Sequence, residues 1–195
     1  MPRRWLLLIY TVPTTPSSTR AYVWREIRRQ GALLLRDGVA ALLDTAAARH
    51  WAAGVGRRLG EGGGTATTAA ATFSPADERR LVDAFRIERT REYAEIVSAC
   101  VGLDEHIARE RDHAEFTFAE LEELEADLGK IRRWFAEVRA RDRFGAASAR
   151  STERSIEVSA RRLARFAERA SAAELAGRAA GPLAAPRRRA SRRSR

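Results

Sequence analysis

The secondary structure of the N-terminal half follows from residues 5–43, which read WLLLIYTVPTTPSSTRAYVWREIRRQGALLLRDGVAALL. The stretch begins with an apolar run that ends at Thr11, passes through a break rich in Pro, Ser and Thr, and becomes basic between Arg20 and Gln30. Two further apolar runs flank Asp37-Gly38, a pair typical of a tight β-hairpin. Short apolar runs bounded by turn residues are typical of buried strands, so the stretch predicts the order strand, helix, strand, strand.

The next residues extend this pattern to six elements. The segment from Thr45 to Leu59 predicts a second helix, and residues 65–73 (TATTAAATF) predict a final edge strand that is poor in large apolar side chains. The first strand is apolar on both faces and is therefore expected to lie in the middle of its sheet. The resulting order β-α-β-β-α-β is that of a ferredoxin-like domain, which is expected to occupy residues 1–73.

The first helix is expected to present a basic surface. Its buried stripe is predicted to contain Ala21, Trp24 and Ile27, with Val23, so that the arginines of the helix point toward solvent. Further arginines follow in the second helix. Guanidinium groups on such a surface can neutralise phosphates, although they provide no base specificity by themselves. The residues predicted to contact nucleic acid are Arg20, Arg25, Arg28, Arg29, Arg57 and Arg58.

Residues 74–176 predict an all-α region after the sheet. Ser74 and Pro75 are typical of a helix start, because Ser caps the first turn and Pro suits the first helical position. This helix is expected to continue, with a break at Gly102, as far as a turn over the charged residues 109–115. The predicted fold class is therefore α+β, a ferredoxin-like domain followed by helices.

A capping box at residues 117–120 predicts the start of the next helix. Its apolar side chains recur at alternating spacings of three and four, which is a seam of heptads. The seam consists of Leu121, Leu124, Leu128, Ile131, Phe135 and Val138. It predicts an antiparallel hairpin with the preceding helix or, alternatively, a homodimeric coiled coil. A further helix from Ser151 would extend the hairpin to three helices.

Positive charge is concentrated at both ends of the chain. The formal net charge is +10 and the isoelectric point is near 11.1. Residues 1–60 carry +7 and residues 146–195 carry +9, whereas residues 87–145 carry −5. This balance predicts a polyanionic partner, with nucleic acid favoured over an anionic membrane. Residues 177–195 are predicted to form a disordered basic tail.

The sequence lacks the usual signatures of catalysis, of metal binding and of membrane insertion. Cys100 is the only cysteine and is expected to be a core residue. His106 and His113 lie two helical turns apart, too far to share one metal ion as an i,i+4 pair does. No nucleotide-binding glycine pattern or nucleophile motif is present, so neither an enzyme nor a cofactor is expected. No apolar run approaches the length of a membrane span, which predicts a cytoplasmic protein.

Several stretches of the chain, taken together, resemble the N-terminal domain of the chromate-resistance protein ChrB family. In the first half they are Trp5–Tyr10, the loop with Pro13 and Pro16, Val23–Arg25, Gly31-Ala32 and Asp37–Val39. In the helical half they are residues 92–95 (EYAE), 116–123 (FTFAELEE), 127–134 (DLGKIRRW) and 139–145 (RARDRFG). The layout is also similar to that of a group of CRISPR-associated nucleases, but the end of the first strand lacks the metal-binding Asp of those enzymes.

The resemblance to ChrB implies a DNA-binding regulator or accessory protein of chromate resistance that acts without catalysis. Full-length members carry a further C-terminal domain, so this chain is expected to be a single-domain form with a separate sensing-domain partner. A structural module that dimerises or docks a partner through its helical hairpin is the alternative. A chromate-linked enzyme is a third hypothesis, which predicts a bound flavin or metal.

Overall fold

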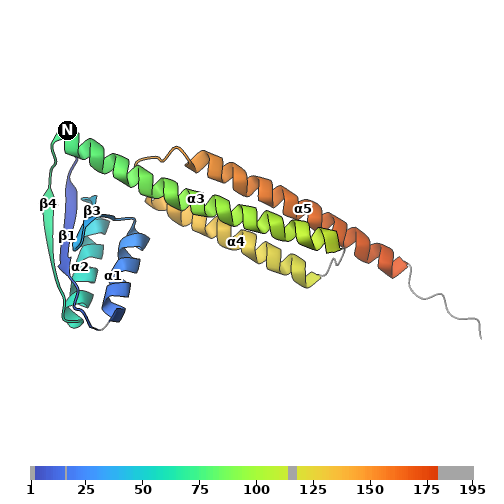
Figure 1. Ribbon diagram of the computed structural model, residues 1–195, viewed down its shortest axis with the longest axis horizontal. Helices are drawn as coiled ribbons and strands as arrows, with labels where there is room; N and C mark the ends of the chain where they lie inside the picture. Colours follow the sequence, from blue (N-terminus) through green and yellow to red (C-terminus); the bar gives the residue numbers. More distant parts are fainter. Residues whose placement is uncertain (1–2, 16, 114–117, 180–195) are drawn as a thin grey trace, which may run out of the picture. The chain divides into compact units, whose positions relative to one another are not determined.

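The computed structural model describes residues 3–15, 17–113 and 118–179, and Figure 1 shows their helices and strands. It is a mixed α+β structure in which four strands precede three long helices. The elements are β1 (Trp5–Thr11), α1 (Ser17–Gln30), β2 (Leu33–Arg36), β3 (Val39–Leu43), α2 (Ala46–Glu61), β4 (Thr65–Ala71), α3 (Pro75–His113), α4 (Phe118–Arg141) and α5 (Ala149–Ala179).

The four strands form one antiparallel sheet in the order β2-β3-β1-β4. The predicted inner position of β1 is confirmed, because β1 pairs with β3 on one side and with β4 on the other. Strand β4 pairs with β1 from Trp5↔Ala71 to Thr11↔Thr65. Its small side chains do not prevent this pairing, since the ladder is made by backbone groups. Gly38 closes the β2–β3 hairpin with φ of 76°, a conformation that suits glycine.

Helices α1 and α2 lie against one face of the sheet, where the larger core of the sheet is found (Figure 1). Leu6 and Leu8 of β1 point into this core. Helix α2 begins at its N-cap Thr45, whose hydroxyl accepts a hydrogen bond from the Ala48 N–H at 3.1 Å. Gly31, which follows α1, has φ of 70° and ends that helix as predicted.

The predicted buried stripe of α1 is confirmed for Val23 and Ile27 and wrong for Ala21 and Trp24. The helix buries Thr19, Val23 and Ile27, which recur every four residues, whereas Ala21 is exposed and Trp24 is 56% exposed. Trp24 lies one position beyond Val23 and is therefore rotated by about 100° away from the sheet. It packs instead under the Arg28 guanidinium, whose carbon lies 5.0 Å from the ring centroid.

The opposite face of the sheet carries an aromatic cluster around Trp5. The Trp5 ring stacks on Phe85 at 5.7 Å and on Phe144 at 5.8 Å, and it meets the edge of Phe73 at 6.1 Å between centroids. Leu81 of α3 is buried in the same cluster. The beginning of α3 and the segment after α4 thus cover this end of the sheet.

Helix α3 differs from its prediction at two places, Gly102 and residues 109–113. Helix α3 is continuous through Gly102 and includes residues 109–113, which were predicted to form a turn. A single glycine costs a helix only about 1 kcal/mol, so a helix of 39 residues tolerates it. Thr117 of the predicted capping box lies outside the described residues. Of the predicted tail, residues 177–179 belong to α5, and the remainder lies outside the described part of the chain.

The described residues divide into two compact units. The first contains the sheet, α1, α2, residues of α3 up to Ile96 and the segment Arg133–Glu153. The second contains the segment Val97–Arg132 and the described residues from Arg154 onward. The first unit continues beyond residue 73, where the sequence predicted a domain boundary. That boundary stays a prediction.

The core of the second unit is made by apolar side chains of its three helical segments. Leu124, Leu128 and Ile131 of the predicted seam are buried within the chain. Cys100 is buried as predicted, and burial raises the pKa of its thiol. Because these seam residues are buried by other residues of the same chain, the packing favours an antiparallel hairpin within the chain. The coiled-coil dimer stays an alternative.

Candidate nucleic-acid interface

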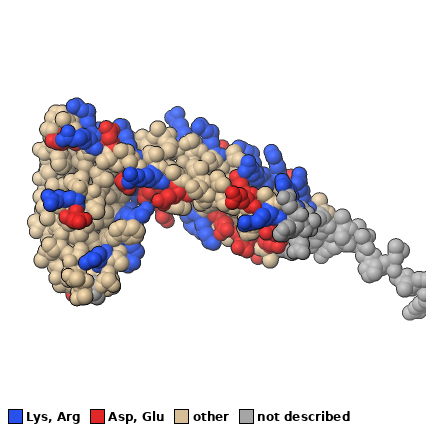
Figure 2. Space-filling model, viewed as in Figure 1, with Lys and Arg blue, Asp and Glu red and all other residues tan. Residues whose placement is uncertain are grey.

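The six arginines predicted to contact nucleic acid all lie exposed on α1 and α2, in the first unit. Two of them, Arg25 and Arg58, line one groove, and two others, Arg20 and Arg28, line a separate cavity. Figure 2 shows basic side chains in separate groups, with acidic and uncharged side chains between them. Arg29 is paired with Glu26 at 2.7 Å, which offsets its charge locally. The structure therefore divides the predicted basic face into smaller sites.

Arg25 of α1 and Arg58 of α2 are brought together in one groove. Its volume is about 350 Å³, and Ser18 and Thr19 of the first turn of α1 also line it. The first turn of α1 contains no acidic residue. Its backbone N–H groups and its helix dipole therefore favour an anion at the same place as the two guanidinium groups.

Gly62 allows the two helices to meet at this groove. It is the C-cap of α2, and a Cβ atom at this position would lie 2.8 Å from Thr19 Oγ1. A larger residue would therefore push the end of α2 away from the first turn of α1. The side chain of Arg58 is held beside the groove by an ion pair with Glu61 at 3.0 Å. Both partners are about two-thirds exposed, so this pair is weak and can exchange for another anion.

Arg20 and Arg28 lie on the other side of α1, at a cavity of about 400 Å³. Tyr10, Trp24 and residues of α3 also line this cavity. The pKa of Tyr10 is raised, first by burial and then by the charge of Asp37. Three glutamates of α3 oppose the arginines that line this cavity, whereas Glu61 is the one acidic residue among those that line the groove at Arg25.

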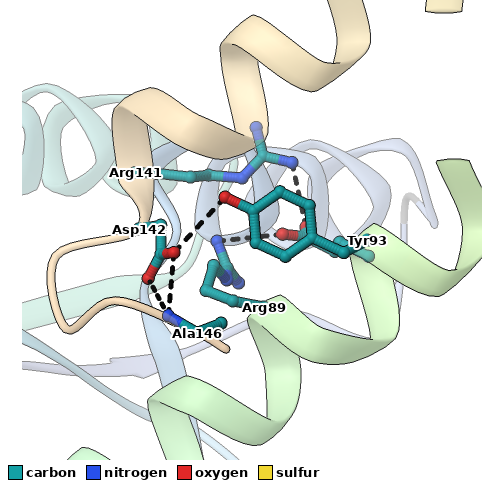
Figure 3. A network of polar contacts seen from close by, with 6 residues as sticks. Arg89, Tyr93, Arg141, Asp142 and Ala146 are labelled. Atoms are coloured by element: carbon teal, nitrogen blue, oxygen red, sulfur yellow. Dashed lines mark hydrogen bonds and ion pairs between the residues drawn. The ribbon is translucent and has the colours of Figure 1, made fainter. Parts of the chain in front are cut away.

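Arg89 and Glu92, which also line this cavity, belong to a buried polar network that the sequence did not predict as a site. Figure 3 shows this network. Glu92 of α3 lies between two arginines, paired with Arg89 at 3.1 Å and with Arg141 at 2.9 Å. The side chains of Arg89, Glu92 and Arg141 are 7%, 7% and 15% exposed. Arg141 donates a hydrogen bond to Glu92, whereas the Arg89 contact is an ion pair without hydrogen-bond geometry. Burial lowers the pKa of Arg89, and the charge of Glu92 opposes this effect.

Asp142 extends the network to the end of α4. Its carboxylate accepts a hydrogen bond from the Tyr93 hydroxyl at 3.3 Å and from the Ala146 N–H at 3.0 Å (Figure 3). The pKa of Tyr93 is raised, first by burial and then by the charge of Asp142. The network thus connects α3 to α4 and to the segment that follows α4.

The sequence does indicate part of this network, because its polar residues on α3 follow the helical spacing of the buried face. Arg89, Glu92, Tyr93 and Ile96 have the spacing i, i+3, i+4 and i+7, so they share one helical face. Charged residues on a face that is otherwise apolar are expected to be buried in pairs. Their partner Arg141 lies 49 residues further along the chain than Glu92, and only the fold shows that they meet.

Replacing Gly31 with alanine is expected to destabilise the protein through this network. A Cβ atom at Gly31 would lie 2.9 Å from Arg141 Cβ and from Arg89 Nη1, and the residue has φ of 70°. Gly63→Ala is the matched control, because Gly63 has φ of 78° and no atom within 4 Å of its added Cβ. The control is expected to lose about 1–2 kcal/mol of unfolding free energy from backbone strain alone. Gly31→Ala is expected to lose a further 1–3 kcal/mol, roughly, from overpacking, as measured by denaturant unfolding. Equal losses in the two variants would contradict the close packing of Gly31.

No group of three or more His, Cys, Asp or Glu side chains among the described residues is placed to hold a metal ion. His106 lies 3.5 Å from Glu110, and the side chain of His113 is outside the described part. None of the described helices is sufficiently long and apolar to cross a membrane.

These features define a class: an α+β protein with a four-stranded antiparallel sheet, exposed arginines on the helices that cover that sheet, and a buried ionic network that connects α3 to α4. A family model described as Protein ChrB, N-terminal, matches residues 20–177. The match covers most of the chain, which therefore belongs to the ChrB N-terminal family and is related to chromate resistance. No curated protein and no solved structure matches the chain.

Proposed function

We propose that this member of the ChrB N-terminal family is a DNA-binding regulator or accessory protein of chromate resistance that acts without catalysis. The observation that carries the proposal is the groove in which Arg25 and Arg58, from two different helices, meet the first turn of α1. The net charge of +10 supports a polyanionic partner. The family membership supports the link to chromate.

The groove offers a phosphate group three kinds of favourable interaction. Two guanidinium groups supply charge and directional donors, which suit phosphate oxygens. The N-terminus of α1 supplies backbone N–H groups and the positive end of its dipole. The Ser18 hydroxyl supplies a further donor. A site of this kind positions DNA through its backbone and reads no base sequence.

The element order and the strand order support a ferredoxin-like domain as the scaffold of this groove. In such a scaffold both crossover helices lie on one face of the sheet, as α1 and α2 do here. The arginines are thus carried on a rigid layer, so a DNA backbone would meet them in a fixed arrangement. Rigid presentation lowers the entropy cost of each phosphate contact.

A titration with duplex DNA at about 50 and 200 mM salt tests the proposal. The wild-type protein is expected to bind, with affinity falling steeply as salt rises because counterions are released from the DNA. The variant with Arg25→Gln and Arg58→Gln is expected to bind more weakly on every sequence, with a salt slope smaller by about 1 for each lost phosphate contact.

The control for this experiment removes the same charge elsewhere. Arg79→Gln combined with Arg80→Gln changes two exposed arginines in the first turns of α3 and leaves α1 and α2 intact. This variant is expected to bind DNA as the wild type does. Absence of wild-type binding at low salt, together with a dimer in light scattering, would contradict the proposal and support the interaction module instead.

A further inference from the structure

A second basic groove lies within the second unit, between α3 and α5. Its volume is about 350 Å³. The residues that line it are Asp104, Ile107, Ala108 and Arg111 of α3, and Arg162, Arg165, Phe166 and Arg169 of α5. None of its arginines was among those predicted to contact nucleic acid from the sequence.

The groove is basic on both walls and apolar at its base. Arg162, Arg165 and Arg169 are separated by three and four residues, so they lie on one side of α5, and all three are exposed. Ile107 and Phe166 are buried and form the apolar base. The regular helical spacing places the guanidinium groups in a row along the groove.

The charge of the groove is strongly positive. Four guanidinium groups and one carboxylate line it. The carboxylate of Asp104 contacts Arg162 Nη1, and its side chain is 16% exposed, so its charge is directed mainly at that one arginine. Asp104 is the one acidic residue among the described residues that line the groove, so an anion could interact with Arg165 and Arg169 without displacing Asp104 from Arg162.

We propose that this groove binds a phosphodiester group of the nucleic-acid backbone, as a second contact separate from the one at Arg25 and Arg58. The inference rests on the proposed DNA binding and extends it to α5. Arginine forks match phosphate oxygens in geometry as well as in charge. A lipid headgroup fits less well, because Ile107 and Phe166 are buried and cannot insert into a bilayer.

The test compares two full-length double variants with the wild type in the same DNA titration. Arg165→Gln with Arg169→Gln removes two charges from the groove. Arg154→Gln with Arg161→Gln removes two charges from exposed positions of α5 that do not line the groove. The groove variant is expected to show a salt slope smaller than that of the wild type by about 1–2, with a matching loss of affinity. The control is expected to retain the wild-type slope, and circular dichroism should show the same helix content in all three proteins.

The outcomes separate this inference from the proposed function. If the wild type binds DNA and the groove variant keeps the wild-type slope, the inference is wrong and the proposed function stands. Equal losses in the groove variant and the control would also overturn the inference, because they would reflect overall charge alone. If the wild type itself does not bind DNA, the proposed function fails and the inference fails with it.

Discussion

Replacement of Glu92 with alanine is expected to lower the free energy of unfolding by about 3–5 kcal/mol. Glu92 is the common partner of Arg89 and Arg141, and all three side chains are largely buried. Its removal would leave two guanidinium groups out of water without a carboxylate between them. A buried charge that loses its partner keeps its full desolvation cost, which is why the effect is large. Denaturant unfolding followed by circular dichroism measures it.

Glu88→Ala provides the matched control on the same helix. Glu88 also pairs with an arginine, Arg91, at 2.7 Å, but its side chain is 43% exposed. Exposed pairs of this kind contribute at most about 1 kcal/mol, so the control is expected to be nearly as stable as the wild type. A loss for Glu92→Ala no larger than that of the control would show that water reaches the network and that it is not buried in solution.

Replacement of Trp5 with alanine is expected to cost about 3–5 kcal/mol as well, for a different reason. Trp5 is fully buried and contacts three aromatic rings that belong to separate parts of the chain. The variant would lose the transfer free energy of the indole and leave a cavity between the sheet and the segments of Phe85 and Phe144. Thermal and denaturant unfolding are both expected to show the loss.

Trp24→Ala is the natural comparison, because it removes the same side chain from an exposed site on α1. Its expected cost is below about 1 kcal/mol, mainly the lost contact with Arg28. Each variant retains three tryptophans, so the unfolding of both variants can also be followed by intrinsic fluorescence. Similar costs for Trp5→Ala and Trp24→Ala would be incompatible with the burial of Trp5 against the sheet.

Some of the stretches that resemble the ChrB family lie in the buried network, whereas the arginines that line the grooves are exposed. Residues 92–95 and 139–145 contact each other through Glu92 with Arg141 and through Tyr93 with Asp142. These stretches therefore hold the first unit together. The arginines of α1 and α2, and those of α5, are on the surface and can be changed without disturbing that network. Variants of the two kinds should consequently separate stability from DNA binding.

Much of the secondary structure could be predicted because its causes are local. The strand Trp5–Thr11, the hairpin at Asp37-Gly38 and the helix starts at Thr45 and Ser74 each depend on residues within a few positions of one another. Turn geometry, capping hydrogen bonds and apolar runs act over that range, so the residues themselves indicate the element. The predicted exposure of the arginines on α1 has the same origin, since their charge opposes burial.

The remaining features depend on contacts between distant residues. Trp24 is exposed because the face of α1 that meets the sheet is set by Thr19, Val23 and Ile27 rather than by the largest apolar side chain. The meeting of Glu92 with Arg141, and the two arginine grooves, require helices that are far apart in sequence to lie against each other. The sequence shows which residues are basic and which helical face each of them occupies. Which of them share a groove depends on how the helices pack, and that packing is driven by the burial of their apolar faces.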